Sequence, residues 1–279
     1  MVAHPPSRSL SRIEARIILG LEEEGRTELS LDDIETRASV GRPFARTLAH
    51  RLARKGWLQR LGGGRYLVNP SRHGPDSIAD TDPFRVGSRL VKPYYFGYAT
   101  AAELWGLLPQ AGPVYYLVST RRTSVAVPHA AQFRLVRVSP ARFFGVTTVR
   151  RRGQSIRVSD RERTVLDCLD RPELSGGLGG AVAVLSSAKP HLAWGRLLRY
   201  VKRTGNRSLA NRLGYLAERV RRSVRPPPAW IRQMLPGPGD PYVPLGLPGG
   251  HARRGTYDPR WHLIRNVADR ELFSEAEVE

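Results

Sequence analysis

The sequence has little cysteine, little lysine and no long apolar segment. Its one cysteine, Cys168, excludes a disulfide framework within the chain and a zinc site built from several thiolates. The seven histidines show no H-x-x-x-H or H-E-x-x-H spacing, so we expect no metal site and no bound cofactor. The longest apolar run, residues 178–188, falls well short of the roughly 20 residues that span a bilayer. Because the N-terminus also lacks the apolar core of a signal peptide, we expect a cytoplasmic protein without membrane association.

Acidic residues are scarce relative to basic ones. The 279 residues include 45 Lys and Arg against 25 Asp and Glu, a formal net charge of +20, and only four of the cations are lysine. Arginine forms paired hydrogen bonds with phosphate and guanine, so this composition indicates a polyanionic partner. With 41% hydrophobic residues, the chain has enough apolar side chains to fill the cores of two domains.

The N-terminal part of the chain predicts helices. Ile13, Ile17 and Leu21 are four residues apart and indicate an amphipathic helix over 8–24. Ser30 is a favourable N-cap residue and Asp33 follows it by three residues, a pattern that predicts the start of a short second helix.

A third helix and a hairpin follow. Pro43 is tolerated in the first turn of a helix, and Gly56 ends the helix predicted over 42–55. Two strand-like runs, 57–60 and 65–68, flank a glycine-rich turn. Three helices and then a hairpin is the order of a winged helix-turn-helix domain, which we predict within residues 1–75.

The third predicted helix has two faces of different character. An apolar stripe repeats every four residues: Phe44, Leu48 and Leu52. The opposite face carries basic residues at the same spacing: Arg42, Arg46, His50 and Arg54. No Asp or Glu occurs between Ser39 and His73. Since like charges one turn apart repel, this face favours a recognition helix that a polyanion neutralises, with a merely solvated basic helix as the alternative.

Each basic residue of this region has an expected role in DNA binding. Arg42 and Arg46, near the start of the helix, are candidates for base edges. The candidates for phosphate contacts are Arg51, Arg54 and Lys55, and His50 on the basic face is a further DNA-binding candidate. Arg60 and Arg65 flank the glycine-rich tip of the wing, where they would follow the backbone or enter a minor groove.

The rest of the chain shows mixed helix and strand signals. Residues 76–89 lie in a segment rich in Pro, Gly, Ser and Asp, which predicts a linker. We predict helices over 98–108, 163–169, 193–203, 208–222 and 229–234. We predict strands over 114–118, 124–127, 133–138, 145–149, 155–158 and 261–267. The expected class is therefore α+β, with a mixed α/β domain over residues 90–279.

Basic residues of this second domain form a further candidate surface. They are Arg150, Arg151 and Arg152 at a strand end, and Arg199 and Arg203 on a predicted helix. A solvated surface, a second nucleic-acid surface and a surface for a protein partner all remain open for them.

The acidic residues of the second domain do not favour catalysis. Asp160, Glu162, Asp167 and Asp170 are the residues that could in principle hold a metal for phosphodiester hydrolysis. Asp160 instead fits a helix start, and Asp167 and Asp170 lie near arginines that suit ordinary ion pairs. Cys168 stands among apolar residues, so a buried structural thiol is the better interpretation. We expect no catalytic residues and no enzymatic activity.

Four segments together resemble one protein family. They are GWLQRLGGGRYLVNP, YATAAELWGLL, VSDRERTVLDCLDRPELSGG and RRGTYDPRWHLIRNV, and they span nearly the whole chain. They resemble AbiEi-type antitoxins, the transcriptional-regulator partners in type IV toxin–antitoxin (abortive infection) systems. The resemblance implies a non-enzymatic protein with a winged helix at its N-terminus and an α/β antitoxin domain at its C-terminus.

The resemblance also implies two activities. The winged helix would bind operator DNA and repress the protein's own operon, and the C-terminal domain would counteract a cognate nucleotidyltransferase-like toxin. We further expect a monomer that binds DNA repeats cooperatively. The residues by themselves leave an alternative open, a winged-helix repressor whose C-terminal domain binds an effector or partner and which has no toxin.

Overall fold

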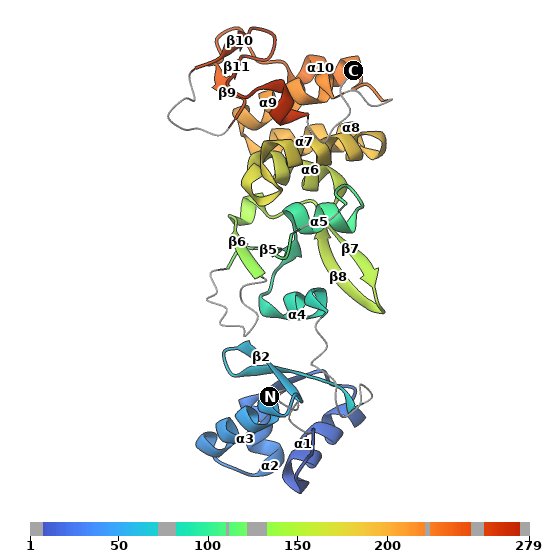
Figure 1. Ribbon diagram of the computed structural model, residues 1–279, viewed down its shortest axis with the longest axis vertical. Coiled ribbons are helices and arrows are strands. Elements are labelled where there is room, and N and C mark those ends of the chain that lie inside the picture. The colour runs from blue at the N-terminus through green and yellow to red at the C-terminus, as the bar shows by residue number, and fades with distance from the viewer. Residues whose placement is uncertain are drawn as a thin grey trace, which may run out of the picture. The chain divides into compact units, whose positions relative to one another are not determined.

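The computed structural model describes residues 8–71, 82–109, 112–121, 133–220, 224–246 and 254–273. The described residues up to Lys92 form one compact unit, and those from Pro93 onward form a second (Figure 1). Each unit combines helices with a β-sheet, so the α+β class expected from the sequence is confirmed.

The N-terminal unit begins with three helices and a three-stranded antiparallel sheet. The helices are α1 (Arg12–Glu23), α2 (Leu31–Ala38) and α3 (Arg42–Arg54). The strands are β1 (Glu28–Ser30), β2 (Leu58–Gly62) and β3 (Arg65–Val68), in the order β1-β3-β2. The turn between β2 and β3 has positive φ at Gly62, Gly63 and Gly64, which favours glycine at all three positions.

Local capping fixes the starts of two of these helices. The Ser30 side chain accepts from the Asp33 backbone N–H, and the Asp33 carboxylate accepts from the Ser30 N–H at 2.8 Å, which is the capping box that the sequence predicts. Ser11 and Glu14 form the same arrangement at α1. Because these contacts span three residues, the local sequence is enough to specify them.

The predicted apolar stripes of α1 and α3 need one correction each. Ile13 is 42% exposed, whereas Ile17, Ile18 and Leu21 are buried. Phe44 is 45% exposed and lies outside the buried set of α3, which is Ala45, Leu48, Ala49 and Leu52. The reason is that α3 packs through a stripe centred between positions 45 and 52, and two alanines there let it approach the core closely.

The predicted linker over 76–89 is also corrected. Residues 83–90 form a further helix, α4 (Pro83–Leu90), with Phe84, Val86 and Leu90 buried. Its Arg89 forms a 2.9 Å ion pair with Glu28 and belongs to the N-terminal unit. With only three large apolar residues in eight, the segment shows too weak a hydrophobic periodicity to predict a helix from the sequence. The helix is stabilised by the burial of these residues in the N-terminal unit. Residues 76–81 lie outside the described part of the chain.

The C-terminal unit contains a five-stranded mixed sheet. Its strands are β4 (Tyr95–Phe96), β5 (Tyr115–Ser119), β6 (Phe133–Arg137), β7 (Val146–Arg151) and β8 (Gln154–Ser159). They lie in the order β6-β5-β4-β8-β7, with β5–β6 and β4–β8 parallel. β7 and β8 pair antiparallel. The predicted strand 124–127 lies outside the described residues.

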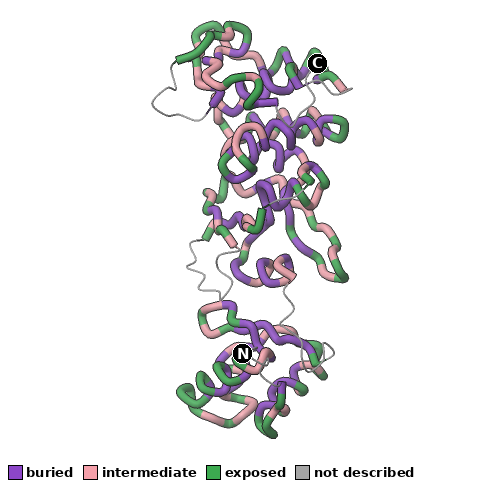
Figure 2. Tube along the Cα trace, in the orientation of Figure 1, coloured by how far each residue is buried: buried purple, intermediate pink, exposed green. Residues whose placement is uncertain are grey.

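Helices make up most of the remaining C-terminal unit. They are α5 (Tyr98–Leu104), α6 (Arg161–Asp170), α7 (Gly177–Ala188), α8 (Trp194–Thr204), α9 (Arg207–Arg219), α10 (Pro228–Met234) and α11 (Asp269–Leu272). Figure 2 shows that α6, α7 and α9 are largely buried. Gly177, Gly179 and Gly180 belong to α7. Gly180 packs directly against the backbone of Ser175. A Cβ at position 180 would therefore come within 2.0 Å of the Ser175 carbonyl oxygen.

A small second sheet lies near the C-terminus. Its strands are β9 (Val243–Pro244), β10 (Thr256–Asp258) and β11 (Leu263–Arg265), in the order β10-β11-β9. The sequence predicts one strand here, over 261–267, and β11 is that strand shortened. Within the described residues, no helix combines the length and apolar character needed to cross a membrane.

Candidate nucleic-acid interface

The outward face of α3 gathers basic side chains. Arg46, His50, Arg51 and Arg54 are all exposed, and none forms an ion pair within the described residues. The opposite face of the helix is buried through Leu48 and Leu52, so the orientation of α3 is fixed by the core. Arg51 and Arg54 lie in the last turn, where cations interact favourably with the helix dipole.

Arg42 and Lys55 differ from the other candidates because carboxylates neutralise them. Arg42 forms ion pairs with Asp32 and, at 2.7 Å, with Glu35, both on α2. Lys55 Nζ lies 2.6 Å from the carboxylate of Glu14, which is fully buried. Although no Asp or Glu occurs between Ser39 and His73, the fold brings acidic side chains from earlier segments next to Arg42 and Lys55.

The Glu14–Lys55 pair is part of the core of the N-terminal unit. Burial alone would raise the pKa of Glu14, but hydrogen bonds from Lys55 and Ser11 outweigh it and hold the pKa below its usual value. Because the buried carboxylate of Glu14 stays charged, it holds the ammonium group of Lys55 beside it. Lys55 therefore fixes α3 against α1, and a phosphate would have to compete with a buried charge for it.

The β2–β3 hairpin carries the two remaining candidates of this unit. Arg60 on β2 and Arg65 on β3 are exposed on either side of the glycine turn. Arg65 reaches the carbonyl of Leu90 at 3.5 Å, a long contact that leaves most of its donors available.

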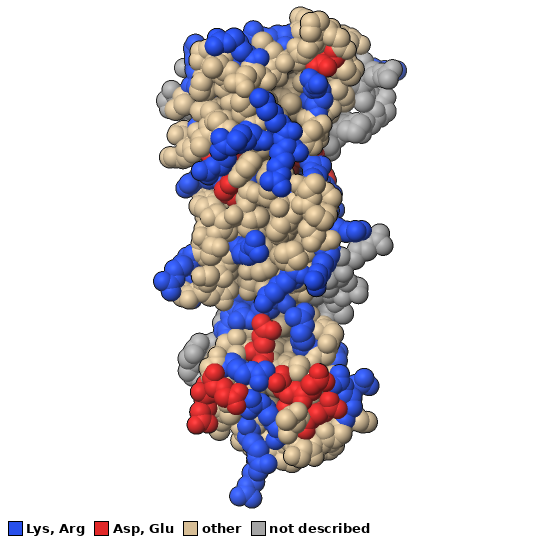
Figure 3. Space-filling view, turned by 180° about the vertical axis from the view of Figure 1, so that it is seen from behind, with Lys and Arg blue, Asp and Glu red and all other residues tan. Residues whose placement is uncertain are grey.

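The positive charge is unequally divided between the two units. Residues 93–279 contain 29 Lys and Arg against 14 Asp and Glu, an excess of 15. Residues 1–92 contain 16 against 11, an excess of 5. Figure 3 shows acidic and basic side chains intermixed on the N-terminal unit, whereas basic ones predominate on the C-terminal unit. A polyanion would therefore be attracted to both units.

The second group of candidates lies on two elements of the C-terminal unit. Arg150 and Arg152 are exposed at the β7–β8 turn, and Arg151 between them is half-buried. Arg199 is exposed on α8. The guanidinium of Arg203, one turn further on, lies 4.3 Å from the centre of the Phe144 ring, where a cation–π contact orients it.

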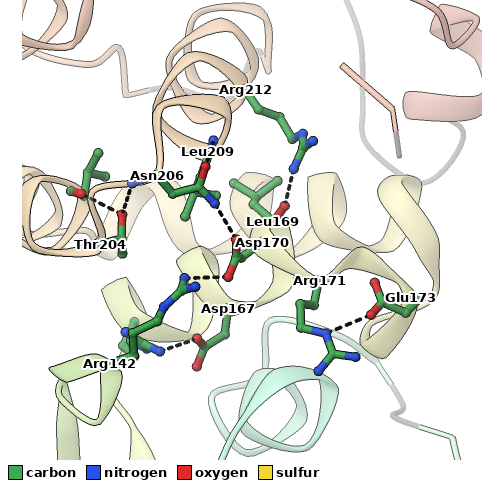
Figure 4. A network of polar contacts seen from close by, with 12 residues as sticks. Arg142, Asp167, Leu169, Asp170, Arg171, Glu173, Thr204, Asn206, Leu209 and Arg212 are labelled. Atoms are coloured by element: carbon green, nitrogen blue, oxygen red, sulfur yellow. Dashed lines mark hydrogen bonds and ion pairs between the residues drawn. The ribbon is translucent and has the colours of Figure 1, made fainter. Parts of the chain in front are cut away.

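The acidic residues of α6 are held by neighbouring donors (Figure 4). Asp167 pairs with Arg163 at 2.8 Å, as the spacing predicts. Asp170 accepts from Arg142 at 2.6 Å and from Asn206 at 2.8 Å, and not from Arg171. No three His, Cys, Asp or Glu side chains gather as metal ligands within the described residues. Cys168 is fully buried, and burial raises the pKa of its thiol, so it lacks the thiolate character of a nucleophile.

A polar pocket of about 460 Å³ lies in the C-terminal unit, and the sequence analysis did not find it. Its charged and histidine side chains are Asp160, Arg161, Glu162, His191 and Arg196, with Trp105 beside them, and Val146, Thr147 and Ala193 complete the lining. Burial raises the pKa of Asp160, against the hydrogen bonds that it accepts from the Arg163 N–H and the Tyr200 hydroxyl. The lining residues come from four separate chain segments, so no local motif in the sequence indicates the pocket.

Comparison with known proteins gives a fold and no family. No protein-family model matches the chain, and no curated protein matches it. The crystal structure of the Rv2827c protein from Mycobacterium tuberculosis is similar, with a TM-score of 0.64, 17% sequence identity and coverage of 92% of both chains. At this identity the similarity concerns the fold alone, and it extends over nearly the full length of both proteins.

Proposed function

We propose that this protein is a DNA-binding transcriptional regulator whose N-terminal unit acts as a winged helix-turn-helix. The observation that carries the proposal is the outward face of α3, where four basic side chains have no carboxylate partner in the described structure. This helix is followed by the β2–β3 hairpin with Arg60 and Arg65 at its tip. A helix that enters the major groove beside a hairpin on the backbone needs this order of elements.

The geometry divides the roles among these residues. Among the basic residues of α3 without a carboxylate partner, Arg46 lies nearest the start of the helix, so we assign it to a base edge, with guanine as the best match for its paired donors. Arg51, Arg54, Arg60 and Arg65 would contact phosphates. Arg42 is exposed enough to exchange Asp32 for a phosphate at little cost. Lys55 would position α3 through Glu14.

The test compares two double variants of the full chain. Arg46→Ala with Arg54→Ala should weaken binding to a duplex from the protein's own promoter by about 1–3 kcal/mol for the base contact, with a further loss from the phosphate contact. Arg12→Ala with Arg16→Ala removes the same charge from the exposed face of α1 and should cost much less. Fluorescence anisotropy over a salt series measures both. Equal losses in the two variants would show that α3 is not the interface.

We further propose that the chain acts as an AbiEi-type antitoxin against a nucleotidyltransferase-like toxin. The resemblance of the sequence motifs supports this, and the positive excess of the C-terminal unit supplies a surface for an acidic partner. The alternative is a repressor without a toxin.

Growth rescue and promoter repression separate these two activities. In cells that express a nucleotidyltransferase-like toxin from the adjacent reading frame, Arg46→Ala with Arg54→Ala should lose repression and keep rescue. Replacement of Arg150, Arg151 and Arg152 together should reduce rescue more than repression. If the unaltered protein represses but never rescues, the antitoxin proposal fails and the repressor without a toxin remains.

A further inference from the structure

We propose that the polar pocket of the C-terminal unit binds a small phosphate monoester. The pocket lies among Trp105, the start of α6 and the start of α8, all within one compact unit. Its volume of about 460 Å³ lies within the range of small-molecule sites and exceeds the needs of a bare inorganic ion. The inference is independent of DNA binding by α3, because no residue of the N-terminal unit takes part.

The two carboxylates of the pocket already have donors for every oxygen. Asp160 accepts from the backbone N–H of Arg163 at 2.8 Å and from the hydroxyl of Tyr200 at 2.8 Å. The pKa of Tyr200 is raised to about 12, chiefly by burial and by this hydrogen bond, so the hydroxyl stays a donor. Asp160 therefore has little capacity left for a cationic ligand.

Glu162 is occupied in the same way. One oxygen accepts from the Ala193 backbone N–H at 2.7 Å, and the other lies 3.4 Å from an Arg196 guanidinium nitrogen. The carboxylate is almost fully buried, so its charge also holds Arg196 at the rim of the pocket. Asp160 and Glu162 thus use their oxygens on hydrogen bonds with neighbouring protein groups. The pocket is left with more free hydrogen-bond donors than acceptors.

Three side chains provide the uncommitted donors. Arg196 uses one terminal nitrogen on Glu162, and its side chain is 46% exposed. The guanidinium of Arg161 lies 4.6 Å from the centre of the Trp105 ring, and its buried Nε has no hydrogen-bond partner in the described structure. His191 is exposed at the same pocket. Two guanidinium groups and an imidazole around one cavity suit the several oxygens of a phosphoryl group.

The indole group of Trp105 gives a direct readout. Its Nε1–H donates to the carbonyl of Ser159 at 2.7 Å, at the wall of the pocket, and the chain has five tryptophans whose indole signals can be separated by NMR. In the ¹⁵N-labelled full chain, ribose 5-phosphate should shift the Trp105 signal, assigned through Trp105→Phe, and leave most of the others in place. Inorganic phosphate should compete more weakly, and ribose should not bind.

Arginine variants at two positions of the pocket and at one control position outside it make the test specific. Arg196→Gln should weaken ribose 5-phosphate binding by about tenfold or more, and Arg161→Gln should have a similar effect. Arg199→Gln removes the same charge from a solvent-exposed position on α8 and should change the affinity by less than about twofold. The proposal is wrong if no phosphorylated probe shifts the Trp105 signal, or if Arg199→Gln weakens binding as much as Arg196→Gln. DNA binding by Arg161→Gln and Arg196→Gln should equal that of the unaltered protein in either case, so this failure cannot be mistaken for failure of the proposed regulator.

Discussion

Replacing Asp167 with alanine is expected to destabilise the C-terminal unit by about 3–5 kcal/mol, because it leaves the buried charge of Arg163 without its carboxylate partner. Arg163 is 2% exposed and pairs with Asp167 at 2.8 Å on the next turn of α6. Its Nε and Nη1 atoms have no hydrogen-bond partner in the described structure. Burial by itself would lower the pKa of Arg163, but the charge of Asp167 outweighs it and the pKa is raised. Without Asp167 the raising effect is lost, but the ordinary pKa of a guanidinium is so far above neutral that Arg163 would stay charged and buried in the variant.

Two further variants locate the origin of this loss. Asp170→Ala removes a carboxylate three residues along the same helix, where the partner Arg142 is partly solvated, and should cost clearly less. Arg163→Met with Asp167→Leu removes both charges and should recover much of the stability that Asp167→Ala loses. Urea denaturation followed by circular dichroism measures all three. A loss from Asp167→Ala no larger than that from Asp170→Ala would mean that water reaches Arg163.

Gly214→Ala should destabilise the same unit by about 3 kcal/mol or more, although alanine is the better helix former. A Cβ at position 214, in the middle of α9, would come within 2.0 Å of the Trp261 ring. The ring is 1% exposed, and its Nε1–H donates to Glu218 at 2.7 Å. Since this hydrogen bond fixes the indole and the surrounding core is closed, neither the ring nor the helix can move away cheaply.

A second helix glycine is the matched control. Gly195 near the start of α8 is exposed, and a Cβ there would meet nothing nearer than a guanidinium nitrogen of Arg199 at 3.9 Å. Gly195→Ala should therefore leave stability unchanged or raise it by up to about 1 kcal/mol. Thermal unfolding of the two variants should move in opposite directions. A Gly214→Ala variant as stable as Gly195→Ala would show that Trp261 does not pack closely on α9.

Sequence reasoning succeeded where the signal was local. The Ser30–Asp33 capping box, the third helix and the hairpin between β2 and β3 each depend on residues a few positions apart. Secondary structure of this kind follows from spacing and turn chemistry, which the sequence displays directly. The same reasoning missed α4, because a helix with so few apolar residues is stabilised by its burial and not by its own pattern.

The candidate interface shows where local reasoning ended. The spacing of Arg42 and Arg46 places both on one face of α3, but it cannot reveal that α2 supplies Asp32 and Glu35 to the first of them. Lys55 likewise meets Glu14, 41 residues earlier. Such pairs depend on how helices pack against one another. For the same reason the pattern could not show that Phe44 points outward.

The sequence by itself determined the α+β class, the order of most elements and the excess of arginine, since these depend on composition and short-range periodicity. The tertiary structure decided which basic residues remain without acidic partners, the strand order β6-β5-β4-β8-β7, and the pocket around Arg196. The physical reason is that periodicity fixes a side chain's direction only relative to its own helix or strand. What that side chain meets, whether solvent, core or an opposite charge, depends on segments brought together from distant parts of the chain.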